Sequence, residues 1–285
     1  MLEQFKKYSI NLHGRLVEID KPLIMGILNA TPDSFYSKSR CIDASSIATR
    51  AIDMVNDGAD IIDIGACSTR PGIDVATEQE EMERLNIAVK AVREKLGNEV
   101  VLSVDTFRAS VARHCVEDLG VDIINDISGG DMDPDMNATV AQLQVPYIVM
   151  HMRGTPATMQ QLTDYDGDVA AVVLESLARK IDILHQMGVN DVIADPGFGF
   201  AKTLEQNYRL MLCLDVFHSL EVPLLVGISR KSMIQKALGC TADEALNGTT
   251  VLNTIALMSG AHILRVHDVK PAVEARTLVS LTRNQ

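Results

Sequence analysis

The chain has 285 residues, 47% of them hydrophobic, and a formal net charge of −12 at pH 7. Its length suffices for one sizeable core, and no apolar run approaches the roughly 20 residues that a membrane helix needs. The acidic balance disfavours nucleic-acid binding, although a local cluster of cations can still bind a small anion at contact distance.

The cysteines and the N-terminus indicate the compartment. Five cysteines are scattered, odd in number and never in Cys-x-x-Cys spacing, which argues against a disulfide framework and against a zinc site. Residues 1–7 contain no apolar stretch of the kind found in signal peptides. We therefore expect a cytoplasmic protein without a membrane segment.

Short apolar runs alternate with segments of helical spacing along the chain. Residues 8–20 alternate around His13-Gly14, which predicts a β-hairpin. The apolar runs that follow are typical of buried parallel strands, at residues 23–28, 60–64, 100–104, 121–124, 146–149, 191–194, 222–226 and 261–264. Helical spacing is found at residues 44–56, 77–96, 108–119, 135–143, 166–187 and 231–260, with a break near Gly239, and a last helix is expected after Pro271.

Eight units of a strand followed by a helix, joined by right-handed crossovers, close most simply into a barrel. An open doubly wound sheet is the rival fold, but no Gly-x-Gly-x-x-Gly follows the first strand. No linker or change of composition divides the chain. We therefore predict a single α/β domain over residues 1–285, a (β/α)8 TIM barrel with the N-terminal β-hairpin at its bottom.

Polar residues come just after the predicted strands, and a barrel would gather them at one rim. They are Asn29, Thr69, Arg70, Asp105, Asn125, Asp195, Lys231, Arg265 and His267. The fifth strand is the exception, because the residue at its end, Met150, is apolar. Any one of them alone is equally well explained as a helix cap or a residue that fixes a loop. The whole series indicates an active site built from several loops.

The acidic and amide members of the series predict a subsite for a heterocycle. Asp105, Asn125 and Asp195 have no evident cationic partner, and Lys231 would neutralise only part of their charge. Their partners are then N–H donors of a ligand such as a pterin or a guanine-like ring. An internal network of salt bridges is the alternative.

The cationic members predict a second subsite. Arg70, Arg265 and His267 suit a pyrophosphate, and the rim after the last two strands is the usual phosphate corner of this fold. Asn29 is a neutral oxygen ligand for a magnesium ion on that pyrophosphate. The alternative is that these arginines are solvated at the surface and bind no ligand. This alternative has more weight for Arg70 than for Arg265.

Eight motifs follow one another in the chain: residues 25–35 (MGILNATPDSF), 68–72 (STRPG), 103–106 (SVDT), 124–130 (INDISGG), 150–156 (MHMRGTP), 195–200 (DPGFGF), 229–232 (SRKS) and 265–268 (RVHD). In this order they resemble the dihydropteroate synthase family over nearly the whole chain. The resemblance implies an enzyme that joins 6-hydroxymethyl-7,8-dihydropterin pyrophosphate to p-aminobenzoate and releases pyrophosphate, with Mg²⁺ as cofactor. It also implies a homodimer and a p-aminobenzoate pocket that sulfonamides occupy.

The resemblance assigns roles by matching position. The pterin is expected at Asp105, Asn125, Met150, Asp195, Phe200, Gly227 and Lys231. The pyrophosphate is expected at Asn29, through the metal, and at Thr69, Arg70, Arg265 and His267. The p-aminobenzoate pocket is expected at Phe35, Thr69, Pro71, Phe200, Lys231 and Ser232. Catalysis is expected to depend on Asp33, Asp105, Asp195, Lys231 and Arg265, with Asp33 ordering the first loop.

The chain departs from the family pattern in two loops. Residues 36–41 lack the glycines that the family often has there, and Ala66-Cys67 replaces the usual Gly-Glu. A pterin-binding barrel without synthase activity, either of a methyl-transfer type or a silent paralogue, is therefore the alternative. Residues 69–71 and the pair Arg265 and His267 favour the synthase, because a barrel without a pyrophosphate substrate has little use for them.

Overall fold

The computed structural model describes residues 5–31, 44–67 and 75–283. Its strands are β1 (Tyr8–Leu12), β2 (Arg15–Ile19), β3 (Leu23–Asn29), β4 (Ile61–Gly65), β5 (Val101–Asp105), β6 (Ile123–Asp126), β7 (Tyr147–Met150), β8 (Val192–Asp195), β9 (Leu225–Val226) and β10 (Ile263–Val266). Its α-helices are α1 (Ala44–Asn56), α2 (Glu78–Leu96), α3 (Ala109–Glu117), α4 (Met136–Leu143), α5 (Val169–Gln186), α6 (Leu204–Leu212), α7 (Ser232–Leu238), α8 (Leu246–Met258) and α9 (Val269–Arg283). Two short 3-10 helices are η2 (Met159–Gln161) and η3 (Leu214–Leu220).

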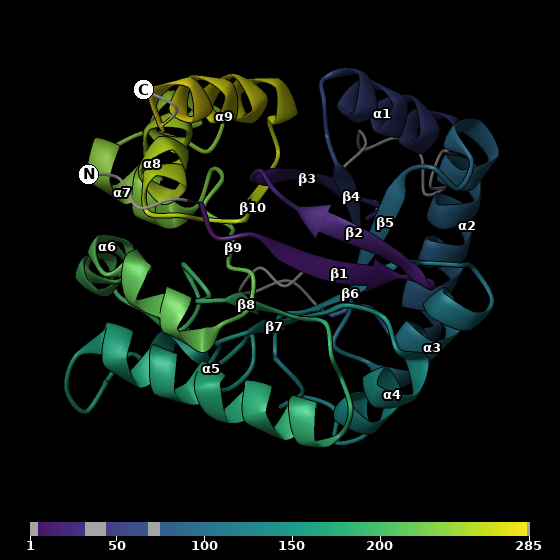
Figure 1. Ribbon diagram of the computed structural model, residues 1–285, viewed down its shortest axis with the longest axis horizontal. Coiled ribbons are helices and arrows are strands. Elements are labelled where there is room, and N and C mark those ends of the chain that lie inside the picture. The colour runs from purple at the N-terminus through teal and green to yellow at the C-terminus, as the bar shows by residue number, and fades with distance from the viewer. Residues whose placement is uncertain (1–4, 32–43, 68–74, 284–285) are drawn as a thin grey trace.

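The predicted barrel is confirmed. Strands β3 to β10 form one parallel sheet in the order β8-β7-β6-β5-β4-β3-β10-β9, and a bridge between Ala194 and Leu224 brings its two edges together. The helices surround this nearly closed barrel (Figure 1). No helix in the described part of the chain is long and apolar enough to cross a membrane.

The hairpin β1–β2 covers the amino-terminal end of the barrel, as predicted, and lies across the middle of the view in Figure 1. Its side chains Ile10, Leu12 and Ile19 are buried. They pack on a layer of barrel residues that all point inward from near the start of their strands: Met25, Ile61, Ile123, Ile148, Ile193, Leu225 and Ile263. The hairpin therefore covers an apolar floor at this end of the barrel.

Alternation along the strands decides what lies above this floor. Successive side chains of a strand point to opposite faces, so the residue two positions after each floor residue also points inward. Those positions are Ile27, Asp63, Asn125, Met150, Asp195, Gly227 and Arg265. The interior thus changes from apolar to polar within one layer, at the carboxyl ends of the strands.

Several predicted boundaries differ from the structure by one to three residues, and two of the differences are explained by proline. The last helix begins at Val269, before Pro271, because proline is tolerated in the first turn of a helix, where its missing N–H has no intrahelical acceptor. The seventh parallel strand comprises only Leu225–Val226 rather than residues 222–226, since Pro223 has no N–H to donate to a neighbouring strand. The predicted start of α2 is correct, with Thr77 and Glu80 forming a capping box.

Candidate active site

The centre of the polar layer is a network around Arg265. Arg265 Nε donates to Asp63 Oδ2 at 2.6 Å, and Arg265 Nη2 donates to Asp105 Oδ2 at 2.8 Å. Asn125 Nδ2 donates to the same Asp63 oxygen at 3.1 Å. Four strands, β4, β5, β6 and β10, therefore contribute to one set of charge-assisted hydrogen bonds.

This network corrects one sequence-based expectation and adds one residue. Asp105 does have a cationic partner, and it is Arg265, so the alternative of internal salt bridges is realised in part. Asp63 was missed because it stands inside an apolar run, although counting two residues on from Ile61 would have placed it on the inward face. Its side chain is completely buried, and Asp63 Oδ1 has no hydrogen-bond partner among the described residues.

The ionisation of this cluster follows from its burial. Burial is the main cause that raises the pKa of Asp105 to about 7; the neighbouring carboxylate of Asp63 acts in the same direction, and Arg265 opposes both. Burial alone would lower the pKa of Arg265, but the charges of Asp63 and Asp105 outweigh it and raise the pKa above its ordinary value. The guanidinium is therefore permanently charged, and Asp105 changes charge near neutral pH.

Asp195 ends strand β8 and is held by the loop that follows it. Gly197 N donates to Asp195 Oδ1 at 2.8 Å, and His151 N donates to the Asp195 carbonyl at 3.0 Å. Gly197 has φ 72°, and a Cβ there would lie 2.0 Å from the His151 carbonyl oxygen. Only glycine fits this junction between the loops after β7 and β8. Burial raises the pKa of Asp195, opposed by the charge of Lys231.

Lys231 is the N-cap of α7 and reaches back to the same loop. Its Nζ donates to the Phe198 carbonyl at 2.5 Å and lies 4.7 Å from the centroid of the Phe200 ring. Burial lowers the pKa of Lys231 to about 8, although Asp195 favours its charged form. The loop after β8 therefore presents Asp195 and Phe200 beside one partly desolvated ammonium.

A second lysine, Lys202, which the sequence reasoning did not find, also holds this loop, and burial lowers its pKa to about 7. Lys202 is buried, and its Nζ donates to the carbonyls of Gly197 and Phe200 at 2.9 and 3.0 Å and contacts His151 Nδ1 at 3.1 Å. Burial lowers the pKa of His151 to about 2, so this imidazole is neutral and its Nδ1 accepts a hydrogen bond from Lys202 Nζ. Two of these three acceptors are backbone carbonyls, which leave no signature in the sequence.

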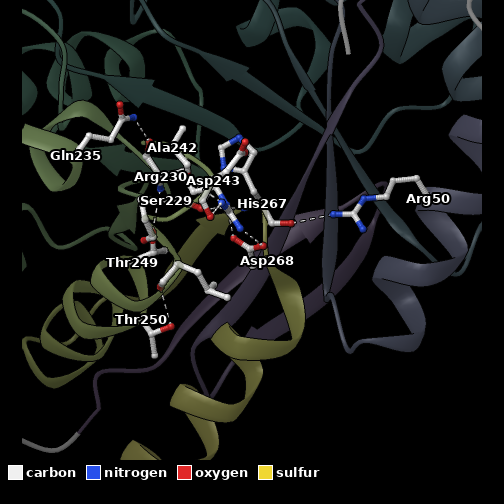
Figure 2. Close-up of polar contacts among 12 residues, drawn as sticks. Arg50, Ser229, Arg230, Gln235, Ala242, Asp243, Thr249, Thr250, His267 and Asp268 are labelled. Atoms are coloured by element: carbon white, nitrogen blue, oxygen red, sulfur yellow. Dashed lines mark hydrogen bonds and ion pairs between the residues drawn. The ribbon is translucent and has the colours of Figure 1, made fainter. Parts of the chain in front are cut away.

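His267 directly follows β10 and lies beside Ser229 (Figure 2). His267 N donates to Ser229 Oγ at 3.1 Å, and His267 Nδ1 lies 3.0 Å from the same oxygen. Arg50 Nη2, from α1, donates to the His267 carbonyl at 3.0 Å. The position of this histidine is therefore set by contacts on both of its sides.

A cavity of about 720 Å³ opens at the carboxyl ends of the strands. Among the residues predicted for the site, it is lined by Asn29, Asp105, Phe200, Gly227, Lys231, Ser232, Arg265 and His267. Asn125, Met150 and Asp195 are buried and do not line it. Asp33, Phe35, Thr69, Arg70 and Pro71, together with the atypical residues 36–41, lie outside the described residues.

The described residues show which side chains could bind a metal ion. They contain no group of three or more histidine, cysteine or acidic side chains that could hold one. Asn29 is exposed at the end of β3 and offers a single amide oxygen at the cavity. An amide oxygen at this place fits an oxygen-preferring ion such as Mg²⁺, which phosphate oxygens also coordinate.

Comparisons with known proteins agree with this site. Residues 25–267 match the family model described as "Pterin binding enzyme". The barrel with its acid and amide layer is thus the fold of this class, and the chain belongs to the family of pterin binding enzymes.

The relatives place the chain more narrowly within this class. It is 42% identical over 274 residues to the dihydropteroate synthase of Escherichia coli (strain K12), covering 94% of each protein, and 44% identical over 250 residues to that of Synechocystis sp., covering 87% of this chain and 85% of the relative. The solved dihydropteroate synthase of Yersinia pestis in complex with a sulfonamide drug superposes with a TM-score of 0.89 at 38% identity, over 97% of this chain and 99% of that one. The enzyme of Xanthomonas albilineans with 4-aminobenzoic acid gives 0.89 at 33% identity, over 97% and 98%. Within its family the chain therefore belongs with the dihydropteroate synthases, which are transferases of folate biosynthesis.

Proposed function

We propose that this barrel binds 6-hydroxymethyl-7,8-dihydropterin pyrophosphate in its polar layer and condenses it with p-aminobenzoate, releasing pyrophosphate. The observation that carries the proposal is the position of Asp105, Asn125 and Asp195 on the inward faces of β5, β6 and β8, below one open cavity. We assign the ring edge of the pterin to these three residues and to Lys231, with Met150, Phe200 and Gly227 against its faces. The 7,8-dihydropteroate bound by the enzyme of Xanthomonas albilineans supports a ligand of this class.

We assign the pyrophosphate to the rim beside this layer, at Thr69, Arg70, Arg265 and His267. Arg265 serves both parts of the substrate, because it already contacts Asp105 and Asp63 at the pterin side. Asn29 is the residue that would hold magnesium together with phosphate oxygens, and the ion would stabilise negative charge on the departing group.

We assign p-aminobenzoate to the part of the cavity between Phe200, Lys231 and Ser232, with Phe35, Thr69 and Pro71 completing the pocket from the first two loops. The aromatic ring of Phe200 and the start of α7 suit a flat substrate with a carboxylate. The 4-aminobenzoic acid bound by the enzyme of Xanthomonas albilineans supports this substrate class.

The main contribution of this chain to the reaction is the stabilisation of charge. Departure of pyrophosphate leaves positive charge that is delocalised into the electron-rich dihydropterin ring. The carboxylates of Asp105 and Asp195 are placed to stabilise that charge, and a cationic ligand favours the ionised form of Asp105. The amine of p-aminobenzoate is nucleophilic when neutral, so no general base is required. We further propose that Asp33 orders the first loop and that the first two loops close over the substrates.

A steady-state assay tests the proposal. Pyrophosphate release is measured with both substrates and Mg²⁺, and binding of the pterin substrate is measured by calorimetry. Asp195→Asn should weaken pterin binding about 10- to 100-fold, because it removes a charged acceptor from a buried site. Asp191→Asn, at the opposite end of the same strand, is the matched control and should leave binding unchanged. Pterin binding without any pyrophosphate release by the wild-type protein would instead support a binding barrel without synthase activity.

We also propose a homodimer formed through α8 and α9. The exposed apolar side chains Val251, Ile255, Leu278 and Leu281 lie on these two adjacent helices. A hollow of about 650 Å³ between them, lined in part by Leu246 and Leu278, offers room for apolar side chains of a second copy.

We propose that the protein forms a single domain over its whole length and works in the cytoplasm. A single barrel sheet and a continuous core around it support the first point. The thiols of Cys115, Cys213 and Cys240, which form no disulfide within the described part of the chain, support a reducing compartment.

A further inference from the structure

Among the charged residues of the sequence motifs that have no role in the proposed chemistry are Arg230, beside Lys231, and Asp268, beside His267. They form an ion pair with each other (Figure 2). Arg230 Nε donates to Asp268 Oδ2 at 2.8 Å, and Arg230 Nη2 donates to Asp268 Oδ1 at 2.9 Å. This two-point geometry fixes the relative orientation of the two side chains as well as their distance.

The rest of the guanidinium is used by a third segment. Arg230 Nη1 donates to the carbonyls of Ala242 and Asp243, between α7 and α8, at 2.7 and 2.9 Å. Four of the five N–H groups of the side chain therefore have protein acceptors. Although Arg230 lines the cavity, its charge is already neutralised by Asp268 and its donors are largely occupied.

The backbone of Arg230 is constrained as tightly as its side chain. Its φ of 54° is in the left-handed region, which arginine rarely adopts and which persists only where the surroundings enforce it. Arg230 N donates to Thr249 Oγ1 at 3.0 Å, and the Arg230 carbonyl accepts from Gln235 Nε2 at 2.8 Å. Arg230 therefore has an unusual backbone conformation that four other segments hold in place. It lies directly between Ser229 and Lys231, which both line the cavity.

The neighbours of the pair are the residues that face the cavity. Ser229 precedes Arg230, and His267 precedes Asp268. The backbone N–H and the imidazole of His267 both contact Ser229 Oγ. Lys231, after Arg230, reaches the loop that carries Phe200. The loops after β9 and β10 are therefore joined by two neighbouring contacts, Ser229–His267 and Arg230–Asp268. We expect a change in one contact to shift the residues of the other.

We propose that Arg230 and Asp268 form a positioning clasp, which places Lys231 and His267 for the reaction, and that the Arg230 guanidinium does not itself bind substrate. The kinetic part of this inference rests on the proposed function, whereas the geometric part does not.

The kinetic test is a double-mutant cycle of Arg230→Gln and Asp268→Asn. For a clasp, each variant lowers kcat/KM about tenfold or more, and the double variant is no worse than either single one, because both remove the same interaction. Additive effects, or a large effect of Arg230→Gln with none of Asp268→Asn, would mean that Arg230 binds substrate directly and would overturn the proposal. The control is Arg209→Gln, which breaks the Arg209–Asp168 ion pair on the outer helices and should leave kcat/KM unchanged.

A spectroscopic readout separates the clasp from a general loss of structure and from failure of the proposed function. The imidazole resonances of His267 are assigned by their absence in His267→Asn and followed by NMR in each folded variant. Both clasp variants should shift these resonances and Arg209→Gln should not, whether or not the wild-type protein releases pyrophosphate. Unmoved His267 resonances, or a lowered urea midpoint with wild-type kcat/KM, would refute the positioning role.

Discussion

Asp63 is the residue through which the two predicted subsites become one. Its single partnered oxygen accepts from both Arg265 and Asn125, so it orients a cation and an amide at the same time. A buried carboxylate that is completely removed from water persists only where such partners compensate its desolvation. Its contribution is therefore to aim Arg265 at the cavity rather than to touch substrate.

We predict that Asp63→Asn lowers kcat/KM for the pterin substrate by about 10- to 100-fold, because the charge-assisted bond to Arg265 becomes a neutral one. Steady-state kinetics of the purified variant measure this. Asp60→Asn is the matched control on the same strand: Asp60 accepts from Arg276 Nη1 at 2.6 Å at the opposite end of the barrel, so it should affect stability and leave kcat/KM unchanged. Equal kinetic losses in both variants would contradict the prediction.

The individual site residues differ in how far the sequence could predict them. Asn29, Asp105 and Asp195 were found because a polar side chain interrupts an apolar run at a place that barrel geometry makes meaningful. The contact between Arg265 and Asp105 spans 160 positions of sequence, and no local pattern distinguishes it from a contact with a ligand. Lys202 was not found, since two of its three acceptors are backbone carbonyls, which every residue has. The role of Arg230 was not found because its carboxylate partner, Asp268, lies 38 positions away in the sequence.

At the scale of elements, the strands extend further than their apolar character does. Asn29, Asp105 and Asp195 are the last residues of β3, β5 and β8 rather than the first of the following loops. Backbone pairing does not depend on the polarity of a side chain, so the ladder continues through the functional residue. The consequence is that these side chains stand on rigid strands, which fixes them better than a loop would.

The hairpin is joined to the barrel by a buried histidine whose ionisation can be followed. His262 Nδ1 accepts from Leu224 N at 3.1 Å, and His262 Nε2 donates to the Lys6 carbonyl at 3.0 Å. Because Nδ1 accepts a hydrogen bond while Nε2 donates one, this pair of bonds together requires the neutral imidazole. Burial lowers the pKa of His262 to about 4, from an ordinary value of 6.5.

This shift predicts how stability depends on pH. Between pH 6.5 and about 4 the unfolded chain takes up a proton at His262 that the folded protein refuses, so the free energy of unfolding falls as the pH is lowered through this range. His262 accounts for at most about 3 kcal/mol of that fall. Urea unfolding of His262→Gln should show a shallower decline, though not a flat one, because His151 is also buried as a neutral imidazole. His13→Gln, on the exposed hairpin turn, is the control, and an unchanged slope in His262→Gln would contradict the assignment.

At the scale of the whole molecule, the two ends of the barrel have separate tasks. The amino-terminal end is closed by the hairpin over an apolar floor, while the carboxyl-terminal end gathers Asp105, Asp195, Lys231 and Arg265. Because the inward faces of the same strands supply both layers, the floor fixes the height and direction of the polar groups above it. The acidic net charge is compatible with an anionic substrate, since the cations that meet it are concentrated at the open end.

The last prediction concerns the oligomeric state, which we expect to depend on the face formed by α8 and α9. Leu278 is 66% exposed and lies beside the hollow between these helices, whereas Leu212 is 74% exposed on α6, on another side of the barrel. A leucine that fills a partner's hollow cannot be replaced by a charge without leaving that charge desolvated. Light scattering should therefore give twice the chain mass of 31.1 kDa for the wild-type protein and for Leu212→Glu, and a single chain mass for Leu278→Glu at micromolar concentration. Since the described cavity lies within one barrel, kcat of the Leu278→Glu monomer should stay within about twofold of the wild-type value. A dimer that survives Leu278→Glu would place the interface elsewhere, and a large fall in kcat would mean that the second copy contributes to the site.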